Sequence, residues 1–130
     1  MTLAEVLATL GGSVSSVNPP IDYGTRSMPL RMVDMEIGRQ RFDIEFLFDK
    51  ETKKLDVVMM VFNGDANAAA FVTVVSALTK RFGNPQQPVK EIGSMGAEWN
   101  FSAVRIQAML FEVPTIGQML KIKWYPNGNL

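Results

Sequence analysis

The spacing of apolar residues predicts two helices, each followed by a group of strands. Leucine and valine recur at helical spacing over residues 2–10, where Thr2 and Glu5 form a capping-box pair. Apolar positions recur at the same spacing over residues 65–82, and Pro85 prevents the helix from continuing. The chain is therefore expected to begin with a short helix and to carry a longer helix at its centre.

Alternation of apolar and polar residues predicts three strands on either side of the central helix. The segments are residues 30–37, 41–48, 55–62, 97–101, 104–111 and 118–125. Ser, Pro and Gly dominate residues 13–29, so this segment is expected to be a connector with one short extended piece around residues 21–23. Two prolines indicate a loop over residues 84–96.

A hairpin turn at residues 38–39 and a charged turn at 49–54 set the register of the first three strands. This register places Val33 opposite Ile44 and Phe46 opposite Val57, so that apolar side chains meet. The third strand is apolar on both sides. Its core side is expected to consist of Leu55, Val57, Met59 and Val61, and its outer side of Val58, Met60 and Phe62.

The last two strands have a register of their own. Pairing Leu110 with Leu120 and Ala108 with Ile122 gives a consistent inner face. Met109 and Met119 then lie on the outer face, where methionine can adapt to varied apolar partners.

These elements predict an α+β fold. An antiparallel sheet is formed by two three-stranded meanders around a central helix (α-βββ-α-βββ), with a short N-terminal helix. Residues 1–130 are expected to form a single domain, with the N-terminal helix and connector in 1–29 and the sheet–helix core in 30–126.

Composition removes many kinds of chemistry. The 130 residues include no Cys and no His, which excludes thiolate or histidine metal centres and hydrolases that depend on either residue. Thirteen basic and thirteen acidic residues give a net charge of zero, which argues against nucleic-acid binding. No apolar run approaches the length of a membrane span. Localisation stays open between cytoplasm and periplasm, because a chain without Cys suits both.

One cluster of carboxylates raises the question of a metal. Asp34, Glu36, Asp43 and Glu45 are expected on one face of the first meander. Such a group can hold a divalent cation and support a metal-assisted hydrolase. The competing interpretation is a solvated strand face whose partners are Arg31, Arg39 and Arg41, and this interpretation is favoured because alternating acids are typical of exposed strands.

The leading functional hypothesis is a non-enzymatic binding module that self-associates as a homodimer and needs no cofactor. Residues 1–65 carry ten acids and seven bases, whereas residues 66–130 carry three acids and six bases. The interface candidates are the apolar residues expected outside the first meander: Met32, Leu47, Val58, Met60 and Phe62. Two alternatives stay open: the N-terminal helix covers this face, or the protein binds a small apolar ligand between helix and sheet.

The second half resembles a known pattern. A helix ending in Lys80-Arg81-Phe82-Gly83, a strand around Trp99 and a closing strand that ends in Trp124-Tyr125-Pro126 are similar to small uncharacterised bacterial α+β proteins, many of them exported. The resemblance covers residues 70–126. It implies a fold and a bacterial origin, and no catalytic residue.

Overall fold

The computed structural model describes residues 1–37, 39–91 and 94–126. Its elements in chain order are α1 (Leu3–Leu10), a short 3-10 turn (Gly11–Ser13), β1 (Ser15–Asp22), β2 (Arg26–Ile37), β3 (Gln40–Asp49), β4 (Leu55–Phe62), α2 (Ala68–Phe82), β5 (Gln87–Glu91), β6 (Ser94–Asn100), β7 (Arg105–Val113) and β8 (Gly117–Tyr125). The predicted α+β class is confirmed. None of the helices in these residues is long and apolar enough to cross a bilayer.

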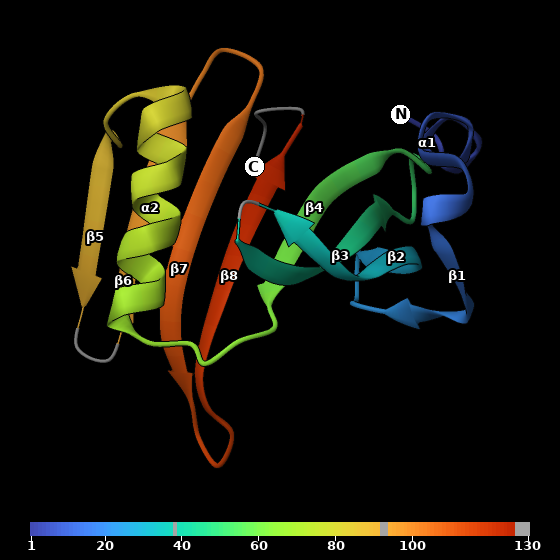
Figure 1. The fold of residues 1–130 in the computed structure, drawn as a ribbon. Helices are drawn as coiled ribbons and strands as arrows, with labels where there is room; N and C mark the ends of the chain where they lie inside the picture. The colour runs from blue at the N-terminus through green and yellow to red at the C-terminus, as the bar shows by residue number, and fades with distance from the viewer. Residues whose placement is uncertain (38, 92–93, 127–130) are drawn as a thin grey trace.

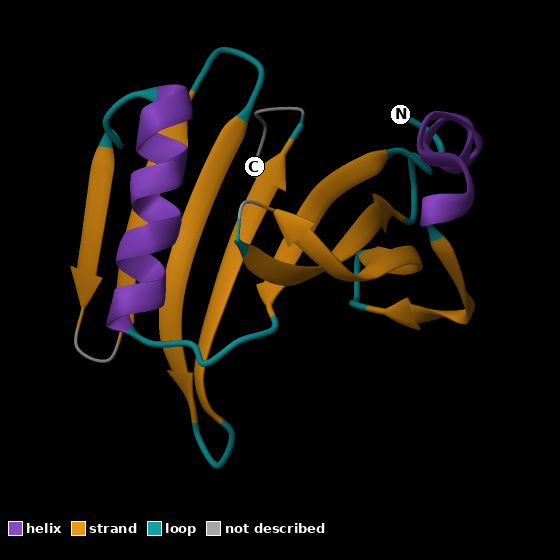
Figure 2. Cartoon of the chain, in the orientation of Figure 1, coloured by secondary structure: helices purple, strands orange, loops and turns teal. Residues whose placement is uncertain are grey.

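All eight strands belong to one antiparallel sheet in the order β1-β2-β3-β4-β8-β7-β6-β5. The pairing of β4 with β8 joins the two meanders, so the last strand of the chain lies at the centre of the sheet. Figure 1 shows α2 in front of the C-terminal strands and α1 at the far end of the N-terminal strands, which are strongly rotated relative to the others. Figure 2 shows the same separation of the two helices.

Local sequence explains both helices. The Thr2 hydroxyl accepts a hydrogen bond from the Glu5 backbone N–H, and the Glu5 carboxylate accepts one from the Thr2 backbone N–H, which completes the predicted capping box. The second helix begins at Ala68, three residues later than predicted, because Asn67 caps it by accepting from the Ala70 N–H. It ends at Phe82, as predicted.

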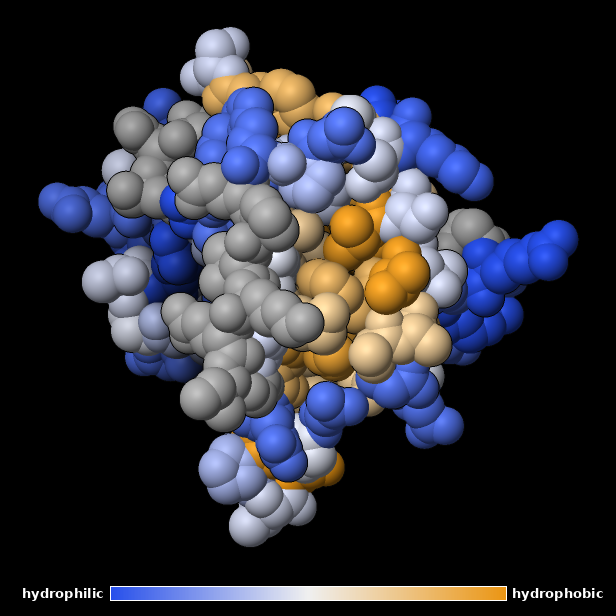
Figure 3. Space-filling model, turned by 90° about the vertical axis from the view of Figure 1, so that its left-hand side faces the viewer, coloured by the Kyte–Doolittle hydropathy of each residue, from blue (hydrophilic) through white to orange (hydrophobic). Residues whose placement is uncertain are grey.

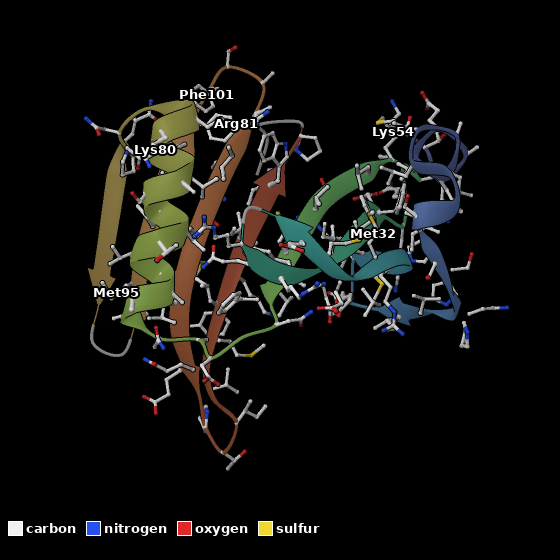
Figure 4. All side chains as sticks on the ribbon, in the orientation of Figure 1. Met32, Lys54, Lys80, Arg81, Met95 and Phe101 are labelled. Atoms are coloured by element: carbon white, nitrogen blue, oxygen red, sulfur yellow. The ribbon has the colours of Figure 1, made fainter. Side chains whose placement is uncertain are left out.

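Both helices cover the same face of the sheet. Beneath α2, Phe71 and Val74 pack in one core with Phe42 and Trp99, and α1 adds Val6 to a second core that contains Phe46. Phe42 and Phe46 point to the same side of β3, because residues four apart on a strand share a face. Figure 4 labels Met95 near the first core and Met32 near the second.

A third core lies on the opposite face of the sheet, the one that neither helix covers. It consists of Met28, Leu47, Val57, Met59 and Tyr125. The strand β4 therefore has buried apolar residues on both sides, as its sequence predicted.

The face assignment of β4 was wrong by one residue. Phe48 lies opposite Leu55, but Leu47 lies opposite Val57, so Asp56 is an extra residue that forms a bulge. The Asp56 carboxylate forms an ion pair with the Arg26 guanidinium, which gives this extra residue a partner. Beyond the bulge every side chain changes face, and Val58, Met60 and Phe62 lie opposite Phe46, Ile44 and Phe42.

A second bulge, in β2, changes the register that the sequence predicts for the hairpin of β2 and β3. Met35 lies opposite Phe42, as a hairpin closed at residues 38–39 requires, but Ile44 lies opposite Met32 and not opposite Val33. Asp34 adopts a φ of 55° at this point, and its backbone N–H donates to the Asp43 carboxylate at 2.9 Å. Without the bulge, the predicted register would place the Asp34 carboxylate opposite that of Asp43, so the bulge replaces a like-charge pair with a hydrogen bond. Residue 38 of the predicted turn lies outside the described residues.

Two predicted connectors contain strands. Part of the expected connector 13–29 forms the edge strand β1, whose register shifts between Ser16 and Ile21, around a cis Asn18–Pro19 bond. Prolines are tolerated there because an edge strand needs fewer ladder hydrogen bonds. The expected loop 84–96 contains β5 and the start of β6. Within the described residues the order is therefore α-ββββ-α-ββββ, with one more strand in each half than predicted.

Candidate functional site

The four candidate metal ligands each have a hydrogen-bond or ion-pair partner. Arg41 forms ion pairs with Asp34 at 3.2 Å and with Glu36 at 3.5 Å. Asp43 accepts hydrogen bonds from the Asp34 backbone N–H and from the Asn63 side chain. These contacts agree with the interpretation of a charged surface with arginine partners.

The fourth carboxylate, Glu45, accepts a hydrogen bond from the Tyr23 hydroxyl at 3.4 Å and lies opposite Arg31. Within residues 1–37, 39–91 and 94–126, no group of three or more carboxylates is close enough to hold a metal ion. These contacts with arginine, asparagine and tyrosine side chains agree with the solvated-face interpretation that the sequence pattern favours, and the metal-assisted hydrolase stays an untested alternative.

The five interface candidates are dispersed. Met32 and Leu47 are buried, with 7% and 6% of their surface exposed, and they belong to different cores on opposite faces. Val58, Met60 and Phe62 are half-buried and pack against the helix-covered cores. The bulge at Asp56 explains the error, because it turns these three side chains toward the helices.

The side of the C-terminal strands opposite α2 offers a different surface, here called the helix-free face. Ala108 and Leu110 of β7 pack beneath α2, so their neighbours Gln107 and Met109 point to the other side. The same alternation places on this face Ser94, Gly96 and Glu98 of β6, Arg105, Gln107, Met109 and Phe111 of β7, and Met119, Lys121, Lys123 and Tyr125 of β8.

The helix-free face combines apolar side chains with charges of both signs. Met109, Phe111 and Met119 are half-buried on it. The Lys121 ammonium lies 5.7 Å from the centre of the Phe111 ring. The Arg105 guanidinium lies 4.8 Å from the centre of the Tyr125 ring. Such cation–π contacts hold the long basic side chains against the sheet while leaving their charges at the surface.

Glu98 is the acidic group of this face. Its carboxylate accepts hydrogen bonds from Gln107 at 2.7 Å and Asn100 at 3.1 Å, and Arg105 lies at 3.5 Å. Partial burial acts to raise the pKa of Glu98, but these hydrogen bonds and the nearby arginine outweigh it, so the pKa lies below its ordinary value. Glu98 is therefore negatively charged at neutral pH.

A trough lies where the helix-free face meets the N-terminal strands. Val57 and Met59 of β4 line it but are almost fully buried, and Tyr23 of the turn between β1 and β2 and Arg26 of β2 add polar groups to its lining. Lys121 and Lys123 line the opposite side, and the volume is about 300 Å³. Burial, together with the negative charge of Glu45, raises the pKa of Tyr23, so its hydroxyl stays protonated.

The outer side of α2 carries another exposed apolar patch. Val72 is 59% exposed, and Ala69 and Ala77 are exposed near it. Figure 3, viewed toward the β5 edge, shows apolar surface gathered over α2 beside the grey atoms. Small residues on one helix face are common and indicate no ligand by themselves.

The sequence placed Met109 and Met119 outward, and the structure confirms this. It did not identify Lys121 and Lys123 as neighbours of Tyr23, because that proximity depends on the pairing of β4 with β8. The available signal was the alternation of Lys121 and Lys123 with the buried Leu120 and Ile122.

Comparison with known proteins gives no assignment, since no protein-family model, no curated protein and no solved structure matches the chain.

Proposed function

We propose that this protein is a non-enzymatic interaction module that binds a second copy of itself through the helix-free face. The observation that carries the proposal is the surface of β6, β7 and β8, which presents Met109, Phe111 and Met119 among charges of both signs. Methionine and aromatic residues are enriched in protein interfaces, and charges around them set orientation.

The absence of His and Cys from the chain supports a binding role, because the common bases and nucleophiles of enzymes are missing. A second copy suits the face because acids and bases occur together on it, so that opposite charges can meet across a two-fold contact. The interface is thus proposed on the second meander, away from the residues suggested by the sequence.

Replacing Met109 with glutamate is expected to convert a dimer to a folded monomer. The new carboxylate would face Lys121 across the strands within one chain, so folding is preserved. Between two copies it would bring like charges together in the contact. Size-exclusion chromatography with light scattering checks this, since the wild-type mass should be twice 14.4 kDa.

The matched control is Val72→Glu, a charge placed on the exposed side of α2, where it should leave the dimer intact. Wild-type protein that stays monomeric at high micromolar concentration would reject the proposal. Dissociation by Val72→Glu, with no effect of Met109→Glu, would assign the interface to α2.

A second candidate function is binding of an amphiphilic carboxylate in the trough, where Lys121 and Lys123 lie beside Val57, Met59 and the Tyr125 ring. The volume of about 300 Å³ is at the lower end of the range for small-molecule sites. This relocates the ligand hypothesis, because the space between α2 and the sheet is filled by the core around Trp99 and Phe71.

Decanoate is a suitable probe and is expected to raise the melting temperature in a saturable way. A ligand at one hundred times its Kd adds about 2.7 kcal/mol of stability. Tyr23→Ala removes an aromatic side chain that lines the trough and should abolish the shift, whereas Phe101→Ala, which changes an exposed aromatic beside Phe82 of α2 that does not line the trough, should not. An unchanged shift in Tyr23→Ala would place any binding elsewhere.

A further inference from the structure

The strand register arranges the helix-free face in rows of three. One row joins Glu98, Gln107 and Lys123, in the order β6, β7 and β8. The next row joins Gly96, Met109 and Lys121. Glu98 is thus on one flank and the two lysines are on the other, while Gln107, Met109 and Phe111 follow β7 between them, and Arg105 lies at the start of β7 against Glu98 and Tyr125.

This order is self-complementary under one particular rotation. A two-fold axis parallel to β7, lying between two facing copies, keeps each row at its level and exchanges the β6 flank with the β8 flank. Glu98 then faces Lys123 of the partner subunit, and this contact occurs twice. Met109 and Phe111 meet their own counterparts at the axis, as an isologous contact requires.

A two-fold axis along a neighbouring strand would be less favourable than one along β7. An axis along β8 would place two lysines without ion-pair partners among the described residues, Lys121 and Lys123, against themselves, which like charges oppose. An axis along β7 opposes only Arg105 to its counterpart, and that guanidinium is paired with Glu98 and stacked on the Tyr125 ring. An axis along β4 would need an accessible Met59, but Met59 is only 7% exposed and lies in the trough that Tyr23 also lines. The strand β7 is therefore the best centre of the contact.

The surface also has a recess that this arrangement fills. Gly96 has no side chain, and a cavity of about 180 Å³ lies beside it, lined by Glu98, Gln107 and Met109 among others. In the two-fold arrangement the aliphatic stem of Lys121 of the partner subunit lies over Gly96. The space that Gly96 leaves on the β6 flank of one copy is thus filled by the long Lys121 side chain on the β8 flank of the other copy.

The charges involved are available for such a contact. Lys123 has no acidic group within salt-bridge distance among the described residues. Glu98 is held in place by Gln107 and Asn100, so little side-chain entropy is lost when a second cation approaches.

From these features we infer a specific dimer, which rests on the proposed self-association: two copies pack face to face about an axis along β7, with Glu98 of each copy paired with Lys123 of the partner subunit. The partner is a second copy of this chain, and the rows on β6 and β8 determine how the two copies are aligned.

Charge reversal tests the pairing. Glu98→Lys and Lys123→Glu should each weaken dimerisation by about tenfold or more, because each places like charges at both pairs. An equimolar mixture of the two variants should form a heterodimer of near wild-type affinity, since both of its pairs then have opposite charges. Sedimentation equilibrium and native mass spectrometry measure these affinities and species.

The equimolar mixture of the two variants distinguishes the claim that the protein self-associates from the claim that the axis follows β7. If wild-type protein is monomeric, the proposed function fails; if it is dimeric and the mixture does not recover affinity, the axis along β7 is wrong and self-association stands. Circular dichroism melting shows whether Glu98→Lys folds, which matters because Glu98 accepts two hydrogen bonds.

A second experiment needs no charge reversal. The chain has no Cys, so Met109→Cys introduces a single thiol. Facing sheets lie about 10 Å apart, so a bismaleimide of that span should link two copies through position 109. Lys80→Cys on the outer side of α2 (Figure 4) is the matched control and should not be linked. Equal linking of both variants, or linking of Lys80→Cys alone, would overturn the arrangement.

Discussion

Replacing Trp99 with alanine is expected to remove a large part of the free energy of unfolding. Trp99 is 1% exposed and lies in the core beneath α2. Truncating a buried aromatic side chain typically costs about 3–5 kcal/mol, out of a total stability of about 5–15 kcal/mol for a domain. Its indole N–H also donates to the Gly83 carbonyl at 2.8 Å, so the substitution leaves the end of α2 without this anchor.

Two variants make the Trp99 experiment specific. Phe101→Ala removes an aromatic ring from the same region, but Phe101 is 46% exposed, so the free energy of unfolding should change little. Trp99→Phe keeps most of the packing and loses the hydrogen bond, so its effect should be intermediate. Urea unfolding followed by circular dichroism measures all three. Equal effects of Trp99→Ala and Phe101→Ala would contradict the assignment of the core.

Replacing Met60 with glutamate should destabilise the fold and leave no soluble native monomer at the temperature where the wild type is folded. Met60 lies opposite Ile44 and Ile122, and it packs against the core beneath α2. Burying a polar group without a hydrogen-bond partner costs about 2–7 kcal/mol, and a carboxylate that stays ionised costs more. This outcome follows from the bulge at Asp56, which turns Met60 toward the helices.

Met109→Glu is the natural comparison, because it places the same charge on the opposite side of the sheet. It should melt close to the wild type while weakening self-association. Thermal melting of both variants checks the contrast. A folded, monomeric Met60→Glu protein would mean that Met60 belongs to an interface, as the unbulged register predicts.

The C-terminal register could be predicted from the sequence, and the N-terminal register only in part. Pairing Leu110 with Leu120 and Ala108 with Ile122 is confirmed, because regular alternation on both strands leaves one good alignment. In β4 both sides are apolar, so the pattern favours neither alignment. The extra residue Asp56 is revealed only by its ion pair with Arg26, which is thirty positions away in sequence.

The edge strands were missed for a different reason. Prolines in β1 and β5 read locally as breaks, but an edge strand tolerates them. The candidate site could also be predicted only in part. The outward position of Met109 follows from the alternation of apolar and polar residues in β7. The proximity of Lys123 to the third core required the β4–β8 pairing, which joins segments that the sequence pattern does not connect.

The central claim is that the helix-free face is where this protein meets its partner copy. A dilution series of amide ¹H–¹⁵N correlation spectra tests it residue by residue. Self-association predicts concentration-dependent shifts in β6, β7 and β8, largest near Met109 and Lys123, and unchanged signals for Val72 and Lys80 on the outer side of α2. Spectra that do not change with concentration, or changes confined to α2 and β1, would contradict the claim.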